Sequence, residues 1–215
     1  MLDVVYTNES REVPFFLEQL KERWLDAAMD HEKFLGLDLE YTADQRGVAV
    51  IQLCFARHVL IFQWASSDKH CPELMDFLRR GISFATVDIR NDKLKMRYNF
   101  SIEIPTGCLI DLQTVFKLRH VRTSMAHMVV ALIDEEYGDM KTSFPKSQHK
   151  LWKKAPLDPI NIEYGAKMHT FHTSCTARFE SSTMASVTSR KVDILIQTIQ
   201  TSSVLNVEHL YIYLW

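Results

Sequence analysis

The 215-residue sequence lacks several features that would place it quickly in a class of protein. It has only six glycines and neither a GxGxxG nor a Walker-type loop, so nucleotide cofactors held by backbone amides are not expected. Its four cysteines are far apart and form no CxxC pair, which predicts reduced, mostly buried thiols. No apolar run approaches the roughly 20 residues of a membrane span. The N-terminal segment MLDVVYTNESREV has no signal-peptide features, which predicts an intracellular protein of the nucleus or cytoplasm.

An excess of either charge is also missing. Lysine and arginine together number 25 and aspartate and glutamate 27, a formal net charge of −2. The chain as a whole therefore has no electrostatic attraction to nucleic acid or anionic lipid, and such a partner must meet a local patch. With 47% hydrophobic and 24% charged residues, the composition is that of a globular protein. We expect one domain over residues 1–180, with residues 181–215 as a helical or irregular C-terminal extension of it.

Hydropathy patterning predicts an α/β layer architecture with a mixed sheet flanked by helices. Apolar runs at 34–42, 48–55 and 58–64 are too closely spaced for helices between them and predict an antiparallel meander. A helix is expected from Pro14 to about Met29, with the side chains of Phe15, Leu17, Leu20, Trp24 and Leu25 facing inward. The remaining predicted strands are 2–7, 82–89 and 106–113, and the remaining predicted helices are 73–80, 92–98 with Asn91 as its N-cap, 124–138 and 160–180.

Three acidic residues lie where acids are unexpected. Asp38 and Glu40 interrupt an apolar strand at positions i and i+2, so both side chains fall on one face of the sheet. Two carboxylates about 6–7 Å apart along a strand repel each other and resist desolvation unless cations neutralise them. Asp92 is a third acid, at a strand–helix junction. Instead of binding a cation, Asp38 and Glu40 could lie at a solvated edge of the sheet. Asp92 could instead interact with the dipole at the N-terminus of its helix.

Four blocks of sequence carry a resemblance to a known family. They are FLGLDLEYTADQRGVAVIQLCFARHVLIFQW, FATVDIRNDKLKMRYNF, IDLQTVF and LWKKAPLDPINIEYGAKMHTF, and they span roughly residues 34–180. Together they resemble the Werner-type 3′–5′ exonuclease domain, and its plant versions most of all. That family belongs to the DEDD group of RNase H-like nucleases. The resemblance implies an RNase H-like, DnaQ-like three-layer fold.

The resemblance also implies an activity, the removal of nucleotides from a single-stranded or 3′-ended nucleic acid. Asp38 and Glu40 match the first motif of the family, Asp92 the second, and Tyr164 the tyrosine of the third. By resemblance the three acids would bind Mg²⁺ or Mn²⁺, which prefer such oxygen ligands, and Tyr164 would help to orient the attacking water.

The sequence departs from the family pattern at the fourth acid, where Met168 stands four residues after Tyr164. A thioether supplies neither the charge nor the hard donor of a carboxylate. A loss of roughly 3–5 kcal/mol in transition-state stabilisation would slow hydrolysis by about 10²–10⁴-fold. His169 or His172 could replace the acid only after a local shift of the helix, and Met168 also fits an apolar stripe. Thr86 and Asp88 occupy positions where the family usually has glycine.

A local basic patch follows from the lysine-rich stretch 140–157, which contains no acid. We expect it to bind nucleic acid, although a solvated loop is the alternative. The sequence thus predicts an exonuclease-like nucleic-acid-binding domain with impaired catalysis. The alternative is a catalytically inactive module that binds nucleic acid or a protein partner. The predicted nucleic-acid contacts are Lys146, Lys150, Lys153 and Lys154.

Overall fold

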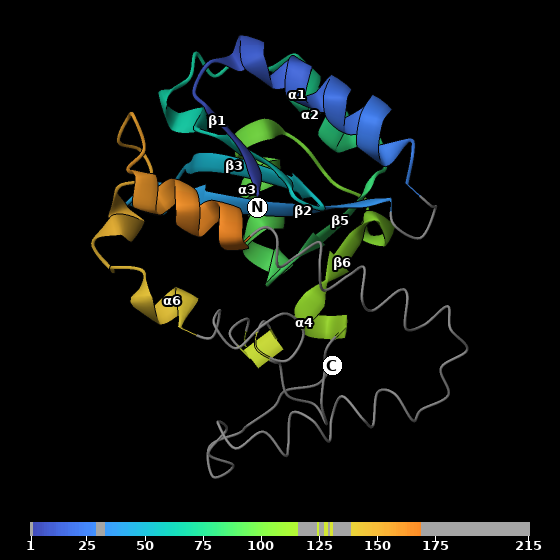
Figure 1. Cartoon of the computed structure of the whole chain (residues 1–215). Coiled ribbons are helices and arrows are strands. Elements are labelled where there is room, and N and C mark those ends of the chain that lie inside the picture. Colours follow the sequence, from blue (N-terminus) through green and yellow to red (C-terminus); the bar gives the residue numbers. More distant parts are fainter. Residues whose placement is uncertain are drawn as a thin grey trace, which may run out of the picture.

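The computed structural model describes residues 2–28, 33–115, 124, 127, 128, 130 and 139–168. The predicted C-terminal extension 181–215, most of the predicted helix 124–138 and residues 169–180 lie outside this part of the chain. The described residues form a mixed sheet flanked by helices, which confirms the predicted fold class (Figure 1). None of the described helices is long and apolar enough to cross a membrane.

Six strands form the sheet, in the order β1-β4-β3-β2-β5-β6. Strands β2, β3 and β4 pair antiparallel, which confirms the predicted meander, whereas β1–β4, β2–β5 and β5–β6 are parallel pairs. Strand β3 is buried along almost its whole length, as expected of a central strand covered on both faces. The strands are β1 (Asp3–Thr7), β2 (Phe34–Tyr41), β3 (Val48–Phe55), β4 (His58–Phe62), β5 (Ser83–Thr86) and β6 (Leu109–Asp111).

The helices lie between and after these strands. A helical turn of wider, π type, Leu20–Leu25, continues the first helix, and residues 159–168 form the last helical segment described. Asp158 caps that last segment, because its carboxylate accepts the amide of Ile160 at 3.1 Å. The helices are α1 (Val13–Gln19), α2 (Pro72–Arg79), α3 (Ile89–Phe100), α4 (Leu112–Val115) and α6 (Met140–Ser143), with 3₁₀ turns at Ser10–Glu12, Trp64–Ser66, Thr106–Cys108 and Gln148–Lys150.

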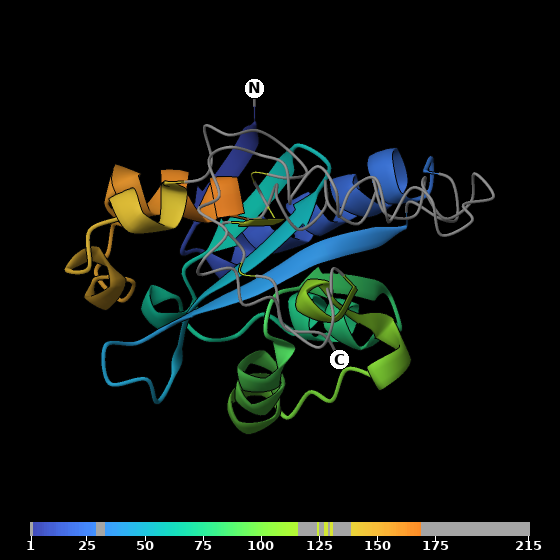
Figure 2. The same cartoon turned by 90° about the horizontal axis from the view of Figure 1, so that it is seen from below.

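Each face of the sheet packs against its own set of helices. Helices α1, α2 and α3 cover one face, where leucines of β2 and β3 meet residues such as Leu20, Leu74 and Met96. The helix 159–168 and the segment before it cover the other face, where Val50 and Ile61 meet Trp152 and further aromatic residues. Figure 2 shows the sheet between α3 and the orange helix 159–168. We call these the first face and the second face.

The structure corrects several sequence-based boundaries. Helix α3 begins at Ile89 and not at Asp92, because Asp88 turns the chain with a left-handed φ of 54° directly after β5. Asn91 is therefore not the N-cap. The strand predicted at 82–89 ends at Thr86, and the one predicted at 106–113 is confined to β6. Phe15 is 68% exposed rather than inward, since the neighbouring Phe16 occupies the inward position of α1.

Candidate functional site

The acid pair lies near the end of β2, at the second face of the sheet. In the β2–β3 register, Asp38 is opposite Gln52 and Glu40 is opposite Val50. Paired residues point to the same side, and Val50 belongs to the second-face core, so both acids point toward the helix 159–168. Both are half-buried, which places the two carboxylates between solvent and the packed helix.

Tyr164 reaches the acid pair from the helix 159–168. Its phenol is buried, and burial, followed by the charges of Glu40 and Asp38, raises its pKa above the ordinary value. The ring is held by other aromatic rings: Phe144 stacks on it with centroids 4.0 Å apart, and His149 meets it edge-on at 5.9 Å. The charges of Asp38 and Glu40 therefore act on the phenol of Tyr164, across the second face of the sheet.

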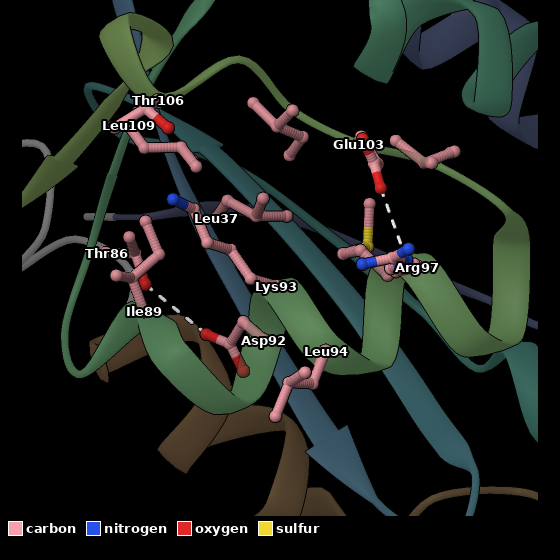
Figure 3. Close-up of a pocket in the computed structure, with 13 residues that line it drawn as sticks. Leu37, Thr86, Ile89, Asp92, Lys93, Leu94, Arg97, Glu103, Thr106 and Leu109 are labelled. Carbon is pink, nitrogen blue, oxygen red and sulfur yellow. Dashed lines mark hydrogen bonds and ion pairs between the residues drawn. The ribbon is translucent and has the colours of Figure 1, made fainter.

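Asp92, the acid of the second motif, is buried at 6% exposure on the first turns of α3. The Tyr41 hydroxyl donates a hydrogen bond to its Oδ1, and the Thr86 hydroxyl donates one to its Oδ2 at 3.3 Å. Burial raises the Asp92 pKa to about 7, and the two hydrogen bonds oppose that rise. Asp92 also lines a cavity of about 310 Å³ between α3 and the segment that leads to β6 (Figure 3).

Tyr41 connects Asp92 to the acid pair. Burial raises the pKa of its phenol, and the charges of Asp92, Asp38 and Glu40 raise it further, in that order. All three acids of the first two motifs are thus within electrostatic reach of one hydroxyl group. Tyr41 is therefore bonded to Asp92 and lies within the electrostatic influence of Asp38 and Glu40, which point to the opposite face of β2.

The fourth position of the implied metal site is apolar. Met168 is 5% exposed and packs in the second-face core with Tyr164, one turn earlier on the same helix. Among the residues that the structure describes, no three His, Cys, Asp or Glu side chains are arranged to hold a metal ion. The donors present therefore do not fit a two-metal centre, and the Mg²⁺ or Mn²⁺ implied by the resemblance stays a prediction. His169 and His172 lie outside the described residues.

The predicted nucleic-acid contacts lie on a segment whose backbone is held to the sheet. The buried Gln63 side chain donates to the carbonyl oxygens of Trp152 at 3.1 Å and Lys154 at 2.7 Å, while its own oxygen accepts the Tyr6 hydroxyl at 2.7 Å. Ser66 adds a bond to the carbonyl of Lys153 at 3.1 Å. Lys146, Lys150, Lys153 and Lys154 are all exposed. Lys153 and Lys154 therefore present exposed cationic side chains from a backbone that Gln63 and Ser66 hold in place.

In the described residues, four side chains have buried polar atoms without a hydrogen-bond partner. Gln52 has no partner at either end of its amide, and the others are Gln148, Trp152 and Asn161. Gln52 lies against the helix 159–168 where Gly165 passes: a Cβ at Gly165 would be 3.0 Å from Gln52 Oε1. The close approach of this helix to β3 thus depends on a glycine.

The sequence reasoning did not single out Tyr41, Thr86, Gln52 or Gln63 as functional residues. Tyr41 directly follows the acid pair, and Thr86 departs from the glycine of the resembling family, so both had a signal in the sequence. The two glutamines lie within apolar runs, where one polar residue is a weak indication of a buried hydrogen-bonding role.

Solved structures share this architecture at low sequence identity. The chain is similar to Trypanosoma brucei RNase D in complex with GMP (TM-score 0.67, 16% identity, 92% of this chain and 63% of that chain). It is similar to the Aedes aegypti Nibbler EXO domain (TM-score 0.63, 15% identity, 91% and 97%). It is also similar to the catalytic core of RRP6 from Trypanosoma brucei (TM-score 0.60, 13% identity, 93% and 51%).

The chain spans less than two thirds of the RNase D structure and about half of the RRP6 core. No family model matches the sequence, and no curated protein matches it. At these identities the likeness establishes the architecture alone. The chain therefore has the RNase H-like fold of DEDD-type 3′–5′ exonuclease domains.

Proposed function

We propose that this chain is a nucleic-acid-binding domain with the exonuclease fold, in which two-metal hydrolysis of phosphodiester bonds is impaired. The observation that carries the proposal is Met168, which fills the place of the fourth acid with a buried thioether in apolar packing. Asp38 and Glu40 remain beside Tyr164, so the acid pair of such a site persists while its ligand set is incomplete.

Binding is supported by the fixed lysine segment. Phosphate contacts supply most of the affinity of non-specific nucleic-acid binding, and the segment presents exposed lysine side chains. The carbonyl bonds from Gln63 and Ser66 hold this backbone in the unbound protein, so less ordering is required when a strand binds. The RNase D relative was solved with GMP, a nucleotide, which agrees with a nucleic-acid ligand for this fold.

A binding titration tests the first half of the proposal. Fluorescence anisotropy with single-stranded DNA and RNA oligonucleotides, in EDTA, compares the wild-type chain with a Lys153→Glu, Lys154→Glu variant. We expect about tenfold weaker binding at low salt and a shallower salt dependence in the variant. Lys21→Glu, at an exposed lysine in the π-type turn Leu20–Leu25, is the control and should bind like wild type. Equal binding by all three proteins contradicts the proposal.

Digestion of a 3′-labelled oligonucleotide tests the second half. With Mg²⁺ or Mn²⁺ present, we expect wild-type cleavage close to that of Asp38→Ala, and a gain of cleavage in Met168→Asp, which restores a carboxylate at the fourth position. Robust wild-type cleavage that Asp38→Ala abolishes contradicts the impairment. Binding without cleavage favours a nucleic-acid module, whereas absence of both favours the protein-interaction alternative.

A further inference from the structure

Two hydroxyl groups from different strands meet on one buried carboxyl group. Tyr41 closes β2 and Thr86 closes β5, and these parallel strands end at the same edge of the sheet. Helix α3 starts just beyond that edge and carries Asp92 back between them. Both carboxyl oxygens of Asp92 accept a hydrogen bond there, one from each hydroxyl. These bonds give Asp92, at 6% exposure, the partners that a buried acid needs.

The position of Tyr41 is fixed by its backbone and by its ring. The register of β2 against β3 shifts between Glu40 and Tyr41, and such bulges re-aim the side chain that follows them. Above the ring, the Lys95 ammonium lies 5.5 Å from the centroid. The same ammonium donates to the carbonyl oxygens of Gln45 and Arg46 in the β2–β3 connection. Tyr41 is therefore held between that connection and α3.

We propose that Tyr41 and Thr86 form a hydroxyl latch that stabilises the buried Asp92 carboxyl group by hydrogen bonding, so that Asp92 keeps its place without a divalent cation. A buried acid needs a cation, a proton or hydrogen-bond donors to offset its desolvation. Here the donors are part of the fold. A cation at Asp92 would compete with these two hydroxyl groups for the carboxyl oxygens, which lowers the affinity of Asp92 for metal.

The latch rests on the proposed function in one respect, that the acid cluster does not run two-metal chemistry. It adds a cause that is separate from Met168, since Asp92 is held by Tyr41 and Thr86 on the side of α3, while Met168 lies on the helix 159–168. The hydrogen bonds to Asp92 and the thioether of Met168 are separable by experiment, because loss of a bond to Asp92 changes the stability of the protein as well as its activity.

Thermal unfolding with and without MnCl₂ tests the latch on the full chain. We expect the wild-type Tm to be the same in EDTA and in MnCl₂. Tyr41→Phe removes one donor and keeps the ring, and should lower the Tm in EDTA by about 5 °C. Added MnCl₂ should then restore at least about 2 °C, because a cation now replaces the missing donor. Thr86→Val, which removes the other hydroxyl, should respond in the same way.

Two further variants locate the effect. Tyr98 is an exposed tyrosine on α3, the helix that carries Asp92, so Tyr98→Phe should behave like wild type. Adding Asp92→Asn to Tyr41→Phe should abolish the response to MnCl₂. A wild-type Tm that rises with MnCl₂ as much as that of Tyr41→Phe overturns the latch. So does a Tyr41→Phe protein as stable as wild type in EDTA. Neither result depends on oligonucleotide binding, so failure of the latch is distinguishable from failure of the proposed nucleic-acid interface.

Discussion

The two faces of the sheet bury polar groups in different ways. On the first face, the network of Tyr41, Thr86 and Asp92 has a donor for each carboxyl oxygen. On the second face, toward the helix 159–168 and the segment before it, lie all the unpartnered buried polar atoms found in the described residues, among them the whole amide of Gln52. In the described residues, the buried polar groups of this first-face network have partners, whereas several on the second face do not.

The two faces of the sheet differ in what their buried polar groups contribute to stability. Unsatisfied buried polar groups cost stability, and natural proteins keep few of them. The second face also holds the acid pair, Tyr164 and the lysine segment. Under the proposed function, we expect first-face substitutions to change mainly stability and second-face substitutions to change binding.

The first-face core should respond to truncation in stability alone. Leu53 is fully buried among first-face residues of β3, and Leu53→Ala should lower the free energy of unfolding by about 2–5 kcal/mol. Urea denaturation measures this loss. Oligonucleotide affinity, measured at a temperature where the variant is folded, should stay within about twofold of wild type. A large loss of affinity in the folded variant would contradict the expectation that the first face affects stability alone.

The raised pKa of Asp92 should appear as a pH dependence of stability in metal-free buffer. Burial raises this pKa to about 7, so between about pH 4 and pH 7 the folded chain keeps a proton that the unfolded chain releases. Stability therefore falls as the pH rises through this window. Asp92→Asn removes the titrating group, so its Tm relative to wild type should increase by several degrees from pH 5 to pH 8.

Asp76→Asn, an exposed acid on α2, is the control for that comparison. Its Tm should follow that of wild type at every pH. If the difference between Asp92→Asn and wild type is constant from pH 5 to pH 8, Asp92 does not titrate in this window and its burial has less effect than the structure indicates.

The sequence was informative where a residue's role depends on its own strand or helix. The period-2 spacing of Asp38 and Glu40 was sufficient to place both on one face, and the short connections were sufficient to predict the meander. Contacts between distant segments could not be predicted. The bond from Tyr41 to Asp92 joins residues 51 positions apart, and it depends on a bulge in β2 and on a left-handed turn at Asp88.

Local pattern also misled where two neighbours competed. Phe15 and Phe16 are equally apolar, and only the packing of α1 decides which is inward. Asn91 is a good N-cap by residue type, but Asp88 turns the chain three residues earlier. Such choices depend on tertiary packing, which one sequence without its fold does not reveal.

The smallest effect should come from the unpartnered amide itself. Gln52→Leu replaces it with an apolar group of similar volume, and we expect the free energy of unfolding to rise by about 1 kcal/mol. Gly165→Ala should lower it, because the new Cβ would be 3.0 Å from Gln52 Oε1. In a Gln52→Ala background that loss should largely disappear, since the crowding atom is gone. Urea denaturation of wild type, Gly165→Ala, Gln52→Ala and the Gln52→Ala, Gly165→Ala double variant gives the coupling energy between the two positions. A Gln52→Leu protein that is less stable than wild type would mean that the amide has a partner in the folded chain, and the contrast between the two faces would then be smaller than the buried polar atoms indicate.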